Sequence, residues 1–320
     1  MTIINEVMMG DSLNVLRKIP DSYVDCVVTS PPYWGLRDYS TNPVLWNDGW
    51  AGELGQEPDF NQYVSHLCDI FDEAKRVLKD TGTCWVNLGD TYGGSGMGIT
   101  STGHCKGKNS ILPDDLSYLP KKAPQKGIYD KSLLMIPFRF AIEMVNRGWI
   151  LRNVIIWQKP NCMPQSVKDR FTVDFEYLFF FSKNKKYYFE QQLEPFKEST
   201  IKRCKSGCNE NKGANYQGLN KKNYEKIQEK ILTGKLEGRN MRSVWDIPTT
   251  NFSGTHFATY PPKLIEIPIK SGCPENGIVL DPFMGSGTTG LVAKQLNLNW
   301  LGIELNPEYA EMAEKRIKAV

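Results

Sequence analysis

Two short segments combine residue types that suit chemistry on a bound ligand. The first, Ser30-Pro31-Pro32-Tyr33, follows a β-branched run from Val24 to Val28 that has the composition of a strand. Adjacent prolines cannot continue a central strand, so the chain must turn there and expose the residues that follow. The hydroxyl of Ser30 and the carbonyl of Pro31 then offer two hydrogen-bond acceptors on a rigid backbone.

Two acceptors in this arrangement suit an exocyclic amino group of a nucleobase. Its nitrogen is a poor nucleophile because the lone pair is conjugated with the ring, and acceptors on both N–H bonds would pull the nitrogen toward tetrahedral geometry. The ring of Tyr33 offers a face for a base taken out of a duplex, with Trp34 beside it. Methylation of a ring carbon would need a cysteine nucleophile, and the sequence has no Pro-Cys pair in such a turn.

The second segment is the glycine-rich turn Asp281-Pro282-Phe283-Met284-Gly285-Ser286-Gly287-Thr288, between an expected strand and an expected helix. Small residues let a ligand approach the backbone, and the helix N-terminus presents free N–H groups. Glu304 ends the next expected strand, where a carboxylate can bind the two hydroxyls of a ribose. The turn differs from a Walker A loop, because Leu291 stands where that loop has lysine.

These residues suit an adenosine-containing cofactor. The literal pattern G-x-G-x-x-G at 285, 287 and 290 also fits a nicotinamide dinucleotide, so an oxidoreductase is an alternative. At the strand tip, we expect Asp281 to repel a pyrophosphate and to attract an ammonium group, which favours S-adenosylmethionine.

The surrounding elements must position these two segments. Strand-like and helix-like stretches alternate along the chain, with strands expected at 3–9, 24–28, 84–88, 150–157, 175–181, 277–280 and 300–304, a hairpin partner at 187–190, and helices at 12–18, 61–78, 133–146, 262–271, from the glycine-rich turn to 296, and from 307. This alternation predicts an α/β fold with a mostly parallel sheet and helices on both faces. The Ser30 turn follows a strand, so it projects at the carboxyl end of the sheet, where such folds bind ligands.

Two stretches interrupt the alternation. Residues 93–130 are rich in Gly, Ser, Lys and Pro, and predict a mobile insertion loop. Residues 199–242 hold eleven Lys and Arg against four Glu, which suits contacts to phosphates, although a solvated surface insertion has the same composition. We therefore expect one domain made of 1–92, 131–198 and 243–320, with the loop and the basic insertion set into it.

Composition narrows the class of protein. The 320 residues suffice for one large domain with an insertion, and the formal net charge of +3 is too small to identify a nucleic-acid partner. Eight cysteines without a C-x-x-C pair, and no leading signal-like segment, predict a reduced, cytoplasmic protein. No run reaches the roughly 18 to 20 apolar residues of a spanning helix, so we expect no membrane role. Cys204 and Cys208 have no further ligands evident nearby, so we expect no metal site.

In this order along the chain, the two segments resemble the motifs of the β class of amino-methylating DNA methyltransferases, in which the catalytic turn precedes the cofactor turn. The resemblance covers nearly the whole chain outside the two interrupting stretches. It implies a Rossmann-like, S-adenosylmethionine-dependent methyltransferase fold with permuted motif order. It also implies that the catalytic motif is formed by Ser30, Pro31, Pro32 and Tyr33.

The same resemblance implies a set of cofactor-binding residues, namely Asp11, Asp281, Pro282, Phe283, Gly285, Ser286, Gly287, Thr288 and Glu304. Gly10-Asp11 is similar to the position near the cofactor adenine, and Glu304 to the acid that holds the ribose. The segment from Thr255 to Pro261 resembles the one that packs near the methionine end. In this family the N-terminal strand lies beside the strand that closes the present chain.

Serine at the first position of the catalytic motif resembles the enzymes that methylate the 4-amino group of cytosine, whereas adenine-specific relatives more often carry Asp or Asn. The resemblance implies a site-specific enzyme acting on a flipped-out cytosine of double-stranded DNA, in restriction-modification or in phage or host DNA protection. Residues 199–242 would then recognise the target, and 93–130 would close over the DNA. Methylation of adenine is the alternative reaction. A nucleic-acid-binding protein without catalytic activity is a further alternative, but mere binding would not require the intact residues of both motifs. The recognition sequence, the oligomeric state and a cognate restriction endonuclease are left open.

Overall fold

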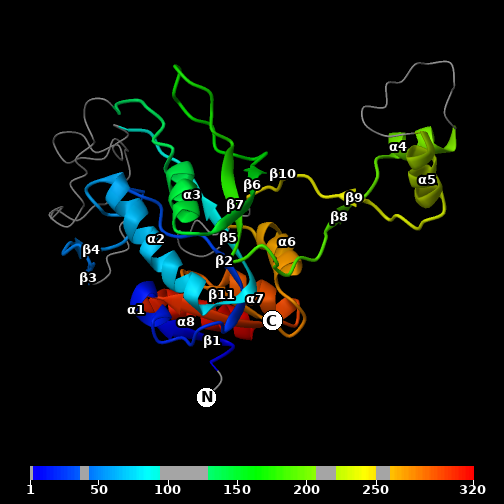
Figure 1. Cartoon of the computed structure of the whole chain (residues 1–320). Coiled ribbons are helices and arrows are strands. Elements are labelled where there is room, and N and C mark those ends of the chain that lie inside the picture. Colours follow the sequence, from blue (N-terminus) through cyan, green and yellow to red (C-terminus); the bar gives the residue numbers. More distant parts are fainter. Residues whose placement is uncertain (1–2, 37–42, 94–128, 207–220, 250–259) are drawn as a thin grey trace. The chain divides into compact units, whose positions relative to one another are not determined.

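The computed structural model describes residues 3–36, 43–93, 129–206, 221–249 and 260–320 (Figure 1). The chain divides into two compact units, one formed by 1–189 and 243–320 and the other by 190–242. The second unit begins before the basic insertion expected at 199–242 and ends at the same residue. Most of the expected loop at 93–130 lies outside the described residues.

An eight-stranded sheet forms the centre of the first unit, in the order β1-β12-β11-β2-β5-β7-β6-β10. Neighbouring strands are parallel except at β7, which runs antiparallel to both β5 and β6. The expectation of a mostly parallel sheet is therefore confirmed. The strands are β1 (Glu6–Met9), β2 (Val24–Thr29), β5 (Leu78–Leu88), β6 (Ile150–Gln158), β7 (Phe175–Ser182), β10 (Val244–Asp246), β11 (Ile278–Asp281) and β12 (Asn299–Glu304).

Helices cover both faces of this sheet (Figure 1). On one face α1 packs against α2 and α2 against α3, and on the other α6 packs against α7 and α7 against α8. Side-chain caps fix where two of these helices begin: Asp59 accepts from two backbone N–H groups of α2, and Asn306 accepts from one of α8. The helices are α1 (Ser12–Leu16), α2 (Phe60–Val77), α3 (Ile136–Asn146), α6 (Pro262–Gly272), α7 (Thr288–Gln295) and α8 (Pro307–Lys318).

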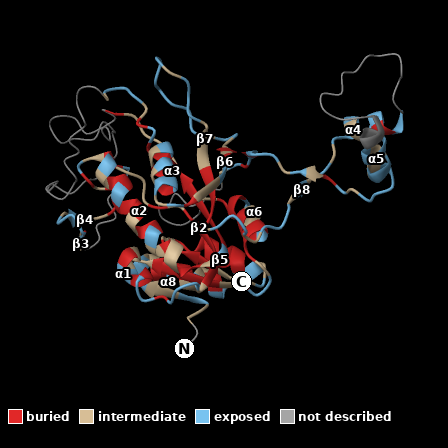
Figure 2. Cartoon of the chain, viewed as in Figure 1, coloured by how far each residue is buried: buried red, intermediate tan, exposed pale blue. Residues whose placement is uncertain are grey.

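The core lies between the sheet and its helices, where Figure 2 shows the buried residues concentrated. Every residue of β2 is buried, as its position between β11 and β5 requires. Residues Leu280 of β11 and Val27 of β2 are partners in the parallel register. The turns that follow β2, β11 and β12 therefore open at the same edge of the sheet, which is where both sequence motifs stand.

Several elements differ from the sequence expectations. Helix α3 starts later than expected because Met135 adopts a left-handed conformation with φ 57°, and Pro137 follows in the first turn. Strand β5 starts at Leu78, directly after α2, which is earlier than the strand expected at 84–88. The expected hairpin strand at 187–190 is absent, since these described residues carry no strand. A short hairpin of β3 (Val44–Leu45) and β4 (Ala51–Gly52) was not expected.

The second unit consists of two short strands and two helices. Strand β8 (Leu193–Glu194) pairs antiparallel with β9 (Arg239–Asn240), and α4 (Glu198–Lys205) packs against α5 (Lys221–Leu232). The carboxylate of Glu194 forms ion pairs with the guanidinium groups of Arg239 and Arg242. Cys204 is buried, and Cys208 lies outside the described residues. Within the described parts of the chain, no helix is long and apolar enough to cross a membrane.

Candidate active site

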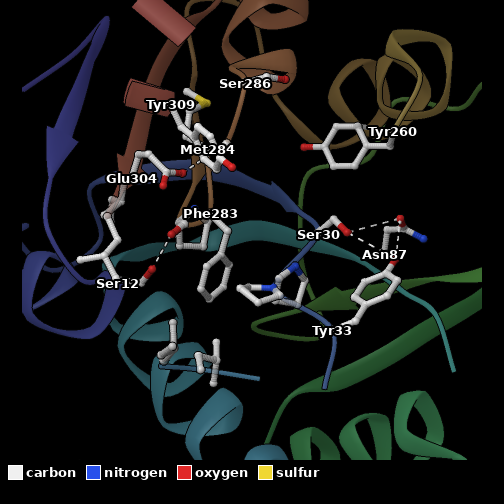
Figure 3. Close-up of a pocket in the computed structure, with 18 of the residues that line it drawn as sticks. Ser12, Ser30, Tyr33, Asn87, Tyr260, Phe283, Met284, Ser286, Glu304 and Tyr309 are labelled. Atoms are coloured by element: carbon white, nitrogen blue, oxygen red, sulfur yellow. Dashed lines mark hydrogen bonds between the residues drawn. The ribbon is translucent and has the colours of Figure 1, made fainter. Parts of the chain in front are cut away.

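A cavity of about 370 Å³ at the carboxyl edge of the sheet joins the two sequence motifs. Figure 3 shows Glu304, Met284 and Tyr309 at one end of it and Ser30 and Tyr33 at the other. The cavity wall contains the predicted residues Ser30, Pro31, Pro32, Tyr33, Asp11, Pro282, Phe283, Gly285, Ser286, Thr288 and Glu304. The strand order explains this convergence, because β1, β12, β11 and β2 are successive neighbours.

The turn after β2 is held by contacts from several elements. The hydroxyl of Tyr63 on α2 donates to the carbonyl of Pro32 at 2.8 Å. The indole N–H of Trp34 donates to the carbonyl of Glu57 at 2.9 Å, and the N–H of Gly35 donates to the carbonyl of Gly55 at 2.7 Å. These bonds fix a turn in which proline leaves few backbone N–H donors.

A buried histidine holds the segment that supplies these contacts. His66 on α2 is 2% exposed, and its ring nitrogens each lie 3.0 Å from a carboxylate oxygen, one of Glu57 and one of Asp48. The ring stacks on Trp46, which lines the cavity, at a centroid distance of 4.2 Å. Burial disfavours the charged imidazolium, but the two carboxylates outweigh burial and hold the pKa of His66 above its ordinary value.

A polar cluster surrounds the Ser30 turn. The hydroxyl of Tyr33 donates to Glu176 Oε2 at 2.8 Å and lies 3.2 Å from Asn87 Oδ1. The hydroxyl of Ser30 lies 3.4 Å from that of Tyr33 and 3.5 Å from Asn87 Oδ1. Lys159 forms an ion pair with the other oxygen of Glu176. Burial, and then the charge of Glu176, raise the pKa of Tyr33 well above its ordinary value.

Sequence reasoning missed three members of this cluster, Asn87, Glu176 and Lys159, all of which line the cavity. For two of these residues, the sequence itself contains a feature that could have indicated a role in the site. Asn87 is a polar residue at the end of the buried strand β5, and Glu176 is an acid within the otherwise apolar strand β7. Their proximity follows from the antiparallel register in which Asn87 is opposite Leu178.

The glycine-rich turn between β11 and α7 is tied to the end of β12. Glu304 accepts from the N–H of Gly285 at 2.8 Å and from that of Asn306 at 2.9 Å, and burial raises the pKa of its carboxyl group. Gly287 lies behind the cavity wall with φ 81°, and a Cβ there would lie 2.8 Å from the Cβ of Ala313. Its role is therefore close packing of the turn against α8.

Asp281 is the last residue of β11, at the strand tip where the sequence analysis placed it. Its side chain is 1% exposed and is not part of the cavity wall. Oδ1 accepts from the Thr29 hydroxyl at 2.5 Å and from the N–H of Phe283 at 3.0 Å, while Oδ2 accepts from Thr289 at 2.5 Å and Tyr260 at 3.0 Å. Burial raises the pKa of this carboxyl group. Asp281 thus ties the end of β2 to the glycine-rich turn and α7.

The cavity fits an adenosine-containing cation. Phe283, Ile303, Leu305 and Tyr309 provide apolar walls beside the Glu304 carboxylate. Among the described wall residues, Asp11, Glu53, Glu176 and Glu304 are acidic, and the one cation, Lys159, is paired with Glu176. Such a surface attracts a sulfonium and an ammonium group and repels a pyrophosphate.

Asp11 and Tyr260, from two further predicted segments, also line the cavity. Asp11 lines the cavity next to β1, but its carboxylate also caps α1 by accepting from the N–H groups of Leu13 and Asn14. Of the segment from 255 to 261, Tyr260 lines the cavity and residues 255–259 lie outside the described residues. Where the chain is described, no group of three or more His, Cys, Asp or Glu could hold a metal ion.

Comparisons with known proteins agree with this geometry. Residues 24–315 match the family model N6_N4_Mtase, described as DNA methylase. The Type II methyltransferase M.SmaI of Serratia marcescens is 38% identical over 312 residues, which cover 98% of this chain and 90% of that protein. The Type II methyltransferase M.Cfr9I of Citrobacter freundii is 38% identical over 311 residues, covering 97% and 86%.

Solved structures share the fold. The PvuII DNA methyltransferase (cytosine-N4-specific) superposes with a TM-score of 0.60 at 20% identity, covering 100% of this chain and 92% of that chain. The M1.HpyAVI–SAM complex superposes with a TM-score of 0.53 at 17% identity, covering 98% of each. The first residue of β1 is opposite Leu301 of β12, which places the N-terminal strand beside the closing strand as the sequence resemblance implied. Since the family model matches most of the chain and the Serratia relative is 38% identical over almost all of it, the chain belongs to the DNA methylase family.

Proposed function

We propose that the protein transfers a methyl group from S-adenosylmethionine to the 4-amino group of a cytosine flipped out of double-stranded DNA. The observation that carries this proposal is the single cavity that joins the Ser30 turn to the glycine-rich turn and Glu304. A flipped base at one end and an adenosine at the other would meet inside it. The fold neighbour M1.HpyAVI was solved as a SAM complex, which supports the choice of cofactor.

The cofactor end has groups that match S-adenosylmethionine. When bound, this cofactor supplies a methyl group activated by a positively charged sulfur. Glu304 would accept hydrogen bonds from the ribose hydroxyls, because a carboxylate has about four lone-pair sites and backbone N–H groups occupy only some of them. The Phe283 ring and Leu305 would contact the adenine.

At the other end, Ser30 and Pro31 would hold the amino group. The Ser30 hydroxyl can donate its one proton to Tyr33 or to Asn87, which leaves its oxygen lone pairs to accept an N–H from the cavity. The Pro31 carbonyl would accept the second N–H. Both bonds strengthen as the nitrogen becomes tetrahedral, which lowers the barrier to methyl transfer. The Tyr33 ring would stack on the base.

Three observations support the choice of base and the biological setting. Ser30 occupies the first motif position, where a hydroxyl suits the cytosine amine, and the fold neighbour from PvuII is cytosine-N4-specific by its title. The relatives M.SmaI and M.Cfr9I are Type II methyltransferases, which supports a restriction-modification role with a cognate endonuclease in bacterial cytoplasm. Adenine is the alternative base, since the same two acceptors could hold its 6-amino group.

The second unit, 190–242, is the proposed target-recognition unit. It exposes a set of basic side chains on and after its two helices, namely Lys202, Arg203, Lys205, Lys226, Lys230 and Lys235. Such side chains suit contacts to DNA phosphates.

The decisive experiment identifies the methylated nucleoside. The protein is incubated with methyl-labelled S-adenosylmethionine and unmethylated genomic DNA, the DNA is digested, and the nucleosides are separated by mass spectrometry. Labelled 4-methylcytosine is the expected product. Labelled 6-methyladenine would overturn the choice of base, and the absence of label from genomic DNAs of several base compositions would overturn the proposed reaction.

A further inference from the structure

A chain of hydrogen bonds leads from the catalytic serine to a carboxylate. From the Ser30 hydroxyl it passes to the Tyr33 hydroxyl and from there to Glu176 Oε2. We propose that this chain removes the proton that the base amine loses on methylation, with Glu176 as the terminal acceptor acting through Tyr33. The proposal rests on the proposed function, and it adds two further roles within the same site.

The geometry aligns the hydroxyls of Ser30 and Tyr33 for transfer toward Glu176. Ser30 donates to Tyr33 across 3.4 Å, and Tyr33 donates to Glu176 across 2.8 Å. Lys159 occupies Oε1 of Glu176, which leaves Oε2 for the Tyr33 hydroxyl. The side chain of Glu176 is 18% exposed, so the carboxylate can release a proton to water.

Glu176 is the member of this cluster that can keep a proton. Asn87 Oδ1 also lies near both hydroxyls, but a neutral amide is a very weak base and its N–H group already donates to the carbonyl of Tyr177. The raised pKa of Tyr33 keeps its hydroxyl protonated near neutral pH, so it passes a proton on only as it receives one. Glu176 is therefore the end of the path.

The proton and electron pairs balance along this path. The exocyclic nitrogen forms a bond to the methyl carbon, the carbon–sulfur bond breaks, and sulfur keeps the electron pair. The nitrogen then carries a positive charge and one proton more than the product has. That proton moves to Ser30 Oγ as the serine proton moves to Tyr33 and the tyrosine proton moves to Glu176. The carboxylate becomes a carboxylic acid and later returns the proton to water.

A double-mutant cycle separates a shared proton path from independent structural effects. The variants are Tyr33→Phe, which keeps the ring but removes the hydroxyl, Glu176→Gln, which accepts a hydrogen bond but no proton, and the double variant. Single-turnover rate constants for labelled 4-methylcytosine are measured with saturating cofactor and DNA. Matched controls are Tyr23→Phe, which removes a hydroxyl bonded to the backbone of Ile3, and Glu143→Gln on α3, which removes a carboxylate paired with Arg147.

Removal of a general base lowers the rate of the chemical step about 10²-fold or more, so the single-turnover rate constant of each single variant should fall by about that factor. The double variant should be no slower than the slower single variant, because both changes interrupt one path. The two controls should stay within about threefold of the wild type. A Glu176→Gln enzyme within threefold of the wild type would overturn the proposal, and so would multiplicative losses in the double variant.

Two further measurements keep the result interpretable. The variant Lys159→Met/Glu176→Gln removes both charges of the ion pair. If its methylation rate returns to the wild-type value, the slow rate of Glu176→Gln is caused by an unpaired ammonium group and not by a lost proton acceptor, and the proposal fails. The ¹⁹F shift of 3-fluorotyrosine at position 33 tests the hydrogen bond in the absence of cofactor, and it should move on Glu176→Gln; an unchanged shift contradicts the path. A wild-type enzyme that labels no DNA would refute the proposed function instead.

Discussion

The carboxylate of Asp281 offers the sharpest test of how the two motifs are held together. Replacement by alanine leaves four donors without their acceptor, namely the hydroxyls of Thr29, Thr289 and Tyr260 and the N–H of Phe283. Even at the value of about 1 kcal/mol that holds for a bond between neutral groups, Asp281→Ala should lower the free energy of unfolding by at least about 4 kcal/mol. Asp281→Asn keeps the shape of the side chain and one acceptor oxygen, so it should lower the free energy of unfolding by roughly half as much as Asp281→Ala does.

Urea denaturation at 25 °C measures this change in the free energy of unfolding, provided that the slope of that free energy against urea concentration is the same in all variants. The matched control is Asp246→Ala, at an exposed position on the edge strand β10, and it should change the free energy of unfolding by less than about 0.5 kcal/mol. Cofactor affinity is measured on the same samples by calorimetry. If Asp281→Ala unfolds as the wild type does and instead loses cofactor binding, the carboxylate contacts the ligand and the assignment here is wrong.

Three further predictions address other parts of the site. Glu304→Gln should weaken cofactor binding by about tenfold or more in calorimetry, because hydrogen bonds to a charged acceptor are worth about 1.5–3 kcal/mol; unchanged affinity would argue against a ribose contact. Gly287→Ala should lower the urea midpoint of unfolding, because the backbone φ is 81° and the added Cβ would lie 2.8 Å from the Cβ of Ala313. Gly234→Ala is the control for the effect of a positive φ alone, because Gly234 is exposed and has no neighbouring atom within 4 Å of the added Cβ. The pKa of His66 is higher in the folded state than in the unfolded state, where it is about 6.5. The protonated histidine therefore stabilises the fold fully at a pH below the unfolded-state pKa, and this stabilisation is lost as the pH rises through the folded-state pKa. Wild-type stability should therefore fall between pH 6 and pH 9 by more than that of His66→Gln, and parallel pH profiles would contradict this.

Local patterns in the sequence predicted most of the elements that position the site. The apolar spacing at 61–78 corresponds to α2 at Phe60–Val77, and the β-branched run at 24–28 corresponds to β2 at Val24–Thr29. Such patterns report which face of an element is apolar, and this is a property of neighbouring residues. They also predicted that both motifs follow strands, which placed them at one edge of the sheet.

The contacts within the site depended on pairing between distant segments, which local patterns do not contain. Glu176 comes near Asn87 because β7 runs antiparallel to β5 in one particular register. Likewise, Asp281 was predicted at a strand tip, but its orientation depends on Thr29 from β2 and Thr289 from α7. Met135 is a similar case, since its left-handed conformation delays the start of α3 and no feature of its type indicates this.

The central claim is that the Ser30 turn performs chemistry on a base while the neighbouring turn holds the cofactor. The most direct measurement compares Ser30→Ala with the wild type in single-turnover formation of labelled 4-methylcytosine and in calorimetric cofactor binding. Loss of an oriented hydrogen-bonding group at a reacting centre costs about 10²- to 10³-fold, so methyl transfer should fall by that factor while cofactor affinity changes by less than about threefold. Methyl transfer at the wild-type rate, or a loss explained entirely by weaker cofactor binding, would contradict the account.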